Sequence, residues 1–253
     1  MSRVPLERAL SKLGLASRTE ARKLIESGKV KVHGKLQTNP LFPVTPETAA
    51  ISIEGLAQAK QNQVLVAFHK PKGVITTKSD EKNRKTVFEC LPTPLRAIKG
   101  LHTVGRLDLA TTGLLLLTND TRLSAWLTDP KNEIPRTYHV SVRGKVSSDT
   151  LVRMQKGVTS EVGHLSALQA QLRKSSEKES HLILTLDEGK NREIRRLCEA
   201  LGHEVTALKR LSYGTLELGD LKPGDTREIS AQELESAFPG HPRSSTLRAP
   251  TPK

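Results

Sequence analysis

Two side chains of opposite charge, Arg106 and Asp108, stand two residues apart just before the most apolar run of the chain. That run covers residues 114–117, follows Gly113, and predicts a strand that is buried on both faces. A carboxylate on a loop that leads into such a strand is well placed for nucleophilic or acid–base chemistry, because loops on rigid scaffolds carry much of catalysis. Taken alone, the residue types favour a simpler interpretation, a loop ion pair between the two side chains.

Tyr138 is a candidate functional residue in a second segment of the chain. Tyr138, Val140 and Val142 alternate with polar residues, which predicts a strand with one buried face. Such a tyrosine is ordinarily a packing residue. Its flat ring and its hydroxyl group can also hold an unstacked nucleobase, so both interpretations stay open at this point.

A third group of residues surrounds the start of a predicted helix. Apolar residues recur at helical spacing over 194–201, and Gly202 ends the pattern. The nearby cations form a solvated helix face in the simpler interpretation, where they pair with Glu199. They can also bind an RNA phosphate at the free amides of the helix start. These cations are Lys190, Arg192, Arg195 and Arg196.

The composition limits what can position these residues. The chain has 253 residues, 36% of them hydrophobic, so one or two domains with a sizeable core are expected. A net charge of +13 indicates a polyanionic partner, nucleic acid before membrane. Two distant cysteines, Cys90 and Cys198, argue against a disulfide framework or a zinc site. No leader segment or membrane span is evident, so a cytoplasmic protein is expected.

Residues 1–60 are predicted to form a small separate domain of two helices and a hairpin. Ser17 and Glu20 form a capping box at the start of the second helix. Basic residues usually form a solvated face, but here both the helices and the hairpin carry them. We therefore expect this unit to anchor RNA through its phosphates and shape. The expected RNA-binding residues are Arg18, Arg22, Lys23, Lys29, Lys31 and Lys35.

Four segments of the chain resemble known motifs. Residues 105–120, GRLDLATTGLLLLTND, resemble motif II of the RsuA-like pseudouridine synthases, which modify ribosomal RNA. Residues 69–74, HKPKGV, and 188–197, EGKNREIRRL, are similar to motifs I and III of the same family. Residues 17–35 resemble the alpha-L RNA-binding motif. One departure follows motif II, where Thr121 replaces a glycine that is frequent in the family.

This resemblance implies an α+β fold. Residues 1–60 would form an alpha-L RNA-binding domain, and residues 61–235 a catalytic domain with a mixed, mainly antiparallel sheet and flanking helices. Residues 238–253 contain no acidic residue and are rich in proline and serine, so they are expected to form a basic disordered tail.

The resemblance also implies an activity, the isomerisation of a specific uridine in ribosomal RNA to pseudouridine, with the large subunit favoured. Asp108 would be the catalytic carboxylate, Tyr138 would pack on the target base, and Arg195 would pair with Asp108. Arg106 would fill the place of the extruded base. Lys70 and Lys72 of motif I are candidate phosphate contacts, as are Lys190, Arg192 and Arg196. The chemistry requires no metal or cofactor, and a monomer acting on structured RNA is expected.

Other functions remain open from the sequence. A small-subunit enzyme would carry the same motifs, and a non-catalytic ribosome assembly factor would explain the charge without Asp108, Tyr138 and Arg195. A glycoside hydrolase would need a second carboxylate across the scissile bond, and no such partner stands out. Within the isomerase interpretation, the aspartate can add to the ring, attack the sugar, or abstract a ribose proton to give a glycal.

Overall fold

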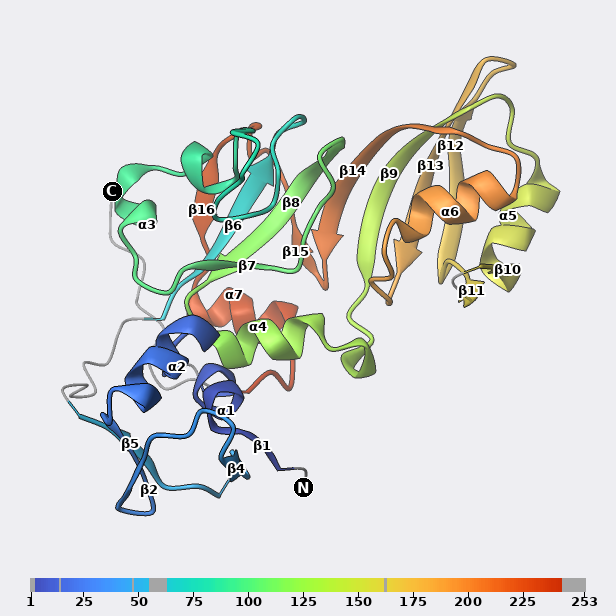
Figure 1. Ribbon diagram of the computed structural model, residues 1–253. Helices are drawn as coiled ribbons and strands as arrows, with labels where there is room; N and C mark the ends of the chain where they lie inside the picture. The colour runs from blue at the N-terminus through green and yellow to red at the C-terminus, as the bar shows by residue number, and fades with distance from the viewer. Residues whose placement is uncertain (1–2, 14, 47, 55–62, 162, 243–253) are drawn as a thin grey trace.

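The computed structural model describes residues 3–13, 15–46, 48–54, 63–161 and 163–242. A small N-terminal unit precedes a larger sheet domain along the chain (Figure 1). The predicted domain boundary at residue 60 lies outside the described residues.

The N-terminal unit has two short helices and a small antiparallel sheet around one apolar core. Leu6, Leu10 and Ile25 of the helices are fully buried in that core together with Val30. The predicted capping box is confirmed, because the Glu20 amide donates to Ser17 Oγ and the Ser17 amide donates to the Glu20 carboxylate. The elements are α1 (Leu6–Lys12), α2 (Arg18–Glu26), the sheet β3 (Lys35–Gln37), β2 (Val30–Val32) and β5 (Ile51–Ile53), and the pair β1 (Val4–Pro5) and β4 (Pro43–Val44).

The larger domain is built on a nine-stranded sheet in the order β12-β13-β9-β14-β8-β6-β16, with β15 beside β14 and β7 beside β8. Only the β8–β14 pair is parallel among the described strands. The mainly antiparallel α+β fold is therefore confirmed. The strands are β6 (Leu65–Lys70), β7 (His102–Val104), β8 (Thr111–Thr118), β9 (Arg136–Arg143), β12 (Gln169–Ser175), β13 (Glu179–Leu186), β14 (Val205–Tyr213), β15 (Leu216–Glu217) and β16 (Thr226–Glu228).

Strand β8 is buried on both faces, as its run of leucines predicts. Leu114 and Leu116 pack with α4 and α7, whereas Leu115 and Leu117 pack against residues of the 74–101 segment on the other face. Helices α5 and α6 cover β9, β13 and β14 through a separate core (Figure 1). The helices are α3 (Thr93–Arg96), α4 (Thr121–Thr128), α5 (Ser148–Lys156), α6 (Glu193–Ala200) and α7 (Ala231–Ala237), with single turns η1 (Phe88–Cys90) and η2 (Pro130–Asn132) and a hairpin of β10 (Val158–Ser160) and β11 (Gly163–Leu165).

The two halves of the sheet join at a short parallel contact. Strands β8 and β14 pair only over Thr111–Gly113 and Leu208–Arg210 and then separate. Gly113 makes this contact possible, since its φ is +102° and a Cβ there would lie 2.2 Å from the Arg210 carbonyl oxygen. The separation of the strands leaves room for a cavity at this junction.

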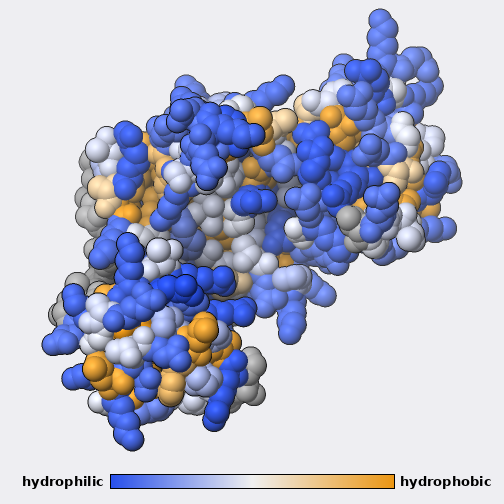
Figure 2. All heavy atoms as spheres, viewed as in Figure 1, coloured by the Kyte–Doolittle hydropathy of each residue, from blue (hydrophilic) through white to orange (hydrophobic). Residues whose placement is uncertain are grey.

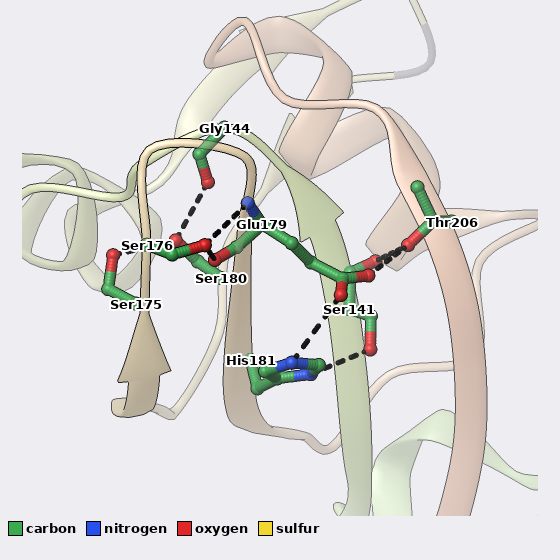
Figure 3. Close-up of polar contacts among 8 residues, drawn as sticks. All are labelled: Ser141, Gly144, Ser175, Ser176, Glu179, Ser180, His181 and Thr206. Carbon is green, nitrogen blue, oxygen red and sulfur yellow. Dashed lines mark hydrogen bonds and ion pairs between the residues drawn. The ribbon is translucent and has the colours of Figure 1, made fainter.

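At the opposite end of β9, β13 and β14, a polar network ties the strands together (Figure 3). Ser180 Oγ donates to the Gly144 carbonyl at 2.8 Å, and Ser141 Oγ lies 2.9 Å from His181 Nδ1. Thr206 Oγ1 donates to the Glu179 carboxylate at 3.1 Å. These bonds hold the strands in register far from the junction, so the half-sheet can carry side chains to the cavity at fixed positions.

The structure differs from expectation at the C-terminus. Phe238 and His241 were predicted to begin a disordered tail, but they are 1% and 8% exposed, and the Phe238 ring contacts Tyr213 edge-on. The predicted start of the disordered tail at residue 238 is therefore wrong. Although its surroundings in the sequence are polar, the Phe238 ring completes the core beside α7. Residues 243–253 lie outside the described residues.

Candidate active site

Hydrogen bonds from residues 73–76 hold the loop that carries Asp108 in place. Thr76 Oγ1 donates to the Leu107 carbonyl at 2.7 Å and accepts from the Leu107 amide at 3.3 Å. The Gly73 amide donates to the Leu109 carbonyl at 2.9 Å. The backbone on both sides of Asp108 is thus fixed, which leaves its half-exposed side chain aimed from a rigid support.

Lys70 belongs to this support and not to the surface. Its side chain is 0% exposed, and Nζ donates to the carbonyls of Pro71 at 3.1 Å, Leu109 at 3.5 Å and Thr111 at 2.8 Å. Burial lowers the pKa of Lys70 to about 8, partly opposed by the charge of Asp108. The predicted phosphate contact by Lys70 is therefore wrong, because the chain folds the Asp108 loop over it. Lys72 is exposed, and its role stays a prediction.

Asp108 lines a cavity of about 210 Å³ at the junction of the two half-sheets. Arg106 and Tyr138 line the same cavity, so the structure brings these three predicted site residues together. Six cationic side chains face three carboxyl groups around it, which makes the cavity suited to an anionic ligand. The cations are Arg106, Arg136, Lys190, Arg192, Arg195 and Arg210, and the carboxyl groups are Asp108, Glu188 and Glu193.

Arg192 is the cation that pairs with Asp108. Its Nη1 lies 3.9 Å from Asp108 Oδ2, and the two side chains are 54% and 40% exposed. An ion pair this exposed contributes at most about 1 kcal/mol to stability, so its significance lies in the charge that it presents to the cavity. The loop ion pair between Arg106 and Asp108, which the residue types alone favour, does not form within the described part of the chain.

The predicted pair between Arg195 and Asp108 is wrong. Arg195 lines the cavity, but its Nη1 donates to the Val205 carbonyl at 3.1 Å, and its buried Nε has no hydrogen-bond partner among the described residues. Helix α6 begins at Glu193, so Arg195 lies in its first turn and faces strand β14. Arg192 precedes the helix in a left-handed conformation, with φ 53° and ψ 32°, and is thereby directed toward Asp108. Where the helix begins, which sequence periodicity gives only approximately, decides between the two arginines.

Tyr138 reaches the cavity from β9. It is half-buried against the core under α6 and lies between Leu184 of β13 and Arg210 of β14 in the sheet. Its ring therefore has firm apolar support on one side and the cavity on the other, which is the arrangement that a base-packing residue needs.

Sequence reasoning missed a stack of three side chains at the back of the cavity. The guanidinium carbons of Arg136 and Arg210 lie 4.7 and 5.1 Å from the centre of the Tyr213 ring. Arg136 also donates to the carbonyls of Asp187 at 2.7 Å and Glu188 at 3.0 Å, and Arg210 Nε donates to the Leu114 carbonyl at 2.6 Å. The stack joins β9, β14 and the 187–193 segment. Its three residues are far apart in the chain, so no local sequence pattern predicts the stack.

The remaining predicted RNA contacts fall into two groups. At the cavity, Lys190 pairs with Glu188 and donates to the His164 carbonyl, whereas Arg196 is half-buried on α6. In the N-terminal unit all six predicted cations are exposed, and Arg22 is bound to Glu7, with Nε 2.7 Å from Oε2. Hydrophilic residues predominate on the face that carries α5 and α6 (Figure 2). The RNA-binding role of these cations stays a prediction.

No group of three or more His, Cys, Asp or Glu side chains in the described residues is arranged to hold a metal ion. None of the described helices combines the length and the apolar character that crossing a membrane requires.

Comparison with known proteins places this geometry in context. The family model for RNA pseudouridylate synthase matches residues 64–200, and the S4 domain model matches residues 4–49. The ribosomal large subunit pseudouridine synthase B of Bacillus subtilis is 38% identical over 235 residues, which cover 91% of this chain and 93% of that protein. An uncharacterised RNA pseudouridine synthase of Aquifex aeolicus is 35% identical over 240 residues, 94% of this chain and 95% of that protein. A crystal structure of a pseudouridylate synthase superposes with a TM-score of 0.65 at 25% identity, covering 92% of this chain and 98% of that chain.

Proposed function

The chain belongs to the RNA pseudouridylate synthase family, and on that premise we propose that it converts a specific uridine of ribosomal RNA to pseudouridine. The observation that carries the proposal is the position of Asp108, on a fastened loop at a cationic cavity, beside Arg192 and Tyr138. The 38% identity to a large-subunit enzyme over most of both chains favours large-subunit RNA as the substrate. A small-subunit substrate is the alternative that the experiment below distinguishes.

The reaction is an isomerisation in which atoms are conserved. The bond from ribose C1′ to uracil N1 breaks, the uracil turns within the cavity, and C1′ joins C5. The hydrogen that leaves C5 is balanced by a proton gained at N1. Asp108 serves as the carboxylate in each of the three routes, through ring addition, sugar attack or removal of a ribose proton. The guanidinium of Arg192 places a positive charge 3.9 Å from the Asp108 carboxylate that all three routes use.

The target base must leave its stack to reach Asp108, which costs on the order of a few kcal/mol. Tyr138 offers the ring on which the extruded uracil packs, with the core under α6 behind it. Arg106 is exposed at the cavity and is placed to occupy the position that the base leaves or to hold the displaced backbone. Arg195, held against β14, is assigned to the cavity wall and not to Asp108.

Binding of the RNA is divided between two parts of the chain. We assign phosphate contacts to Arg18, Arg22, Lys23, Lys29, Lys31 and Lys35 of the S4 domain, to Lys190 and Arg192 at the cavity, and to Arg196 on α6. A structured RNA that reaches both parts at once gains specificity from shape as well as charge. We also propose that the protein acts as a monomer in the cytoplasm, which light scattering of the purified protein and fractionation of cells would test.

Mapping of pseudouridine in ribosomal RNA tests the proposal. In cells that lack this protein, one or a few pseudouridines should be missing from large-subunit RNA, and a plasmid copy should restore them. If a pseudouridine is missing from small-subunit RNA instead, the substrate is small-subunit RNA. An unchanged map of both RNAs would refute the proposed function.

A further inference from the structure

Glu193 is a buried acid at the cavity that the proposed mechanism does not use. It is the first residue of α6, it is 6% exposed, and it follows Arg192 directly in the chain. It also lines the same cavity as Asp108. A carboxyl group is rarely buried so deeply without a specific task or partner.

The carboxyl group of Glu193 closes a tight turn. Its Oε2 accepts from the Lys190 amide at 3.2 Å, and the Glu193 amide donates back to the Lys190 carbonyl at 3.3 Å. Arg192 lies inside this turn with φ at 53°, a conformation that costs about 1 kcal/mol or more for a residue with a side chain. The contacts of Glu193 with Lys190 therefore hold the conformation that directs Arg192 toward Asp108.

The charge of Glu193 matters as much as its position. An ionised carboxylate next to Arg192 would attract the guanidinium and compete with Asp108 for it. A neutral carboxylic acid keeps the hydrogen bond from Lys190 but exerts no such pull. The surroundings favour the neutral form, because the side chain is buried and the negative charge of Glu188, itself paired with Lys190, opposes a second charge there.

We propose that Glu193 is a positioning residue whose carboxyl group fixes the 190–193 turn and so directs Arg192 to pair with Asp108. The proposal rests on the proposed function, since its readout is pseudouridine formation. It assigns Glu193 no contact with the substrate.

The electrostatics agree with this geometry. Burial, and after it the charge of Glu188, raises the pKa of Glu193 to about 7, while Lys190 acts in the opposite direction. The neutral form is therefore lost as the pH rises through 7. The charged and titratable groups that face Glu193 or share its cavity are Asp187, Glu188 and Lys190 of the preceding segment, Arg192 and Arg195 of α6 and its start, Arg106 and Asp108 of the catalytic loop, Arg136 and Tyr138 of β9, and Arg210 and Tyr213 of β14.

Single-turnover rates on a ribosomal RNA fragment at pH 6 and pH 8 test the proposal. The neutral fraction of a group with a pKa of about 7 falls about tenfold over this range, so the wild-type rate should fall about tenfold. Glu193→Gln, which is permanently neutral and of the same shape, should match the wild-type rate at pH 6 and lose at most about twofold at pH 8.

Two further variants separate position from charge. Glu193→Ala removes the acceptor for the Lys190 amide and should lower the single-turnover rate at saturating RNA at least about tenfold at both pH values. Its melting curve shows whether the domain is folded. Glu199→Gln makes the same chemical change at an exposed position of α6 and should reproduce the wild-type profile.

The outcomes are distinct. If Glu193→Gln falls with pH as steeply as the wild type, or if folded Glu193→Ala keeps the wild-type rate, the proposal is wrong. If the wild type itself forms no pseudouridine in any ribosomal RNA, the proposed function fails instead, before Glu193 is tested.

Discussion

Replacing Thr76 with valine should loosen the Asp108 loop without changing any side chain that is proposed to contact the substrate. Thr76 Oγ1 makes two hydrogen bonds to Leu107, the residue next to Asp108, at 2.7 and 3.3 Å. Valine has nearly the same shape but can neither donate nor accept. Leu107 is buried, so its amide and carbonyl lose these partners where water does not easily replace them.

The magnitude follows from the two bonds. Each contributes about 1 kcal/mol, so Thr76→Val should destabilise the protein by about 2 kcal/mol. For a domain of this size that corresponds to a fall in Tm of about 4–8 °C. Displacement of a reacting group by about 1 Å can cost about a hundredfold in rate, so kcat should fall about ten- to hundredfold while KM changes little.

The assay combines thermal unfolding with the release of tritium from RNA labelled at uracil C5, since that hydrogen leaves in the reaction. Thr77→Val is the matched control, because Thr77 Oγ1 donates to the Ser79 carbonyl in an exposed loop and not to the Asp108 loop. Thr76→Ser keeps the oxygen and should recover most of the rate. Equal stability and equal kcat for the valine variants at 76 and 77 would show that the loop is not held in this way.

Two further predictions concern Lys70 and the S4 domain. The pKa of Lys70, about 8 when folded, lies below its ordinary value of 10.5, so protonation of Lys70 opposes folding and stability rises with pH above 8. Urea unfolding of wild type and Lys70→Met at pH 7 and pH 9.5 tests this. Between these pH values the free energy of unfolding of wild type should rise by about 2 kcal/mol relative to that of Lys70→Met. A difference that does not change with pH would contradict the assigned burial of a charged lysine. Charge reversal of Lys23 and Lys31 together should weaken RNA binding and reduce the dependence of log K on log salt by about two. Unchanged affinity and slope would remove these residues from the RNA interface.

Features that depend on neighbours in the chain were predictable from the sequence. The capping box at Ser17 needs only Glu20 three residues later, and both bonds are present. The four leucines of β8 predict burial on two faces because a strand alternates its side chains, and all four are 0% exposed. The apolar stripe over 194–201 likewise predicts α6. Asp108, Tyr138 and Arg106 were placed by motif resemblance, and the structure gathers them at one cavity.

Features that depend on contacts between distant segments were not predictable in the same way. From the sequence, Lys70 was predicted to be a surface cation that contacts phosphate, but the loop of Asp108 covers it. The exchange of Arg195 for Arg192 depends on a left-handed residue before α6, which the spacing of apolar residues does not reveal. The stack of Arg136, Tyr213 and Arg210 joins strands that only the sheet topology brings together.

The role of Asp108 is tested most directly by replacing it with asparagine. Asp108→Asn keeps the shape of the side chain and removes its charge, and Asp220→Asn makes the same change at an exposed position. Purified proteins are incubated with ribosomal RNA from cells that lack the enzyme, and pseudouridine and RNA binding are measured on the same samples. We expect Asp108→Asn to bind the RNA with wild-type affinity and form no pseudouridine, while Asp220→Asn forms it at the wild-type rate. Pseudouridine formed by Asp108→Asn above the level of a sample without enzyme would contradict the account.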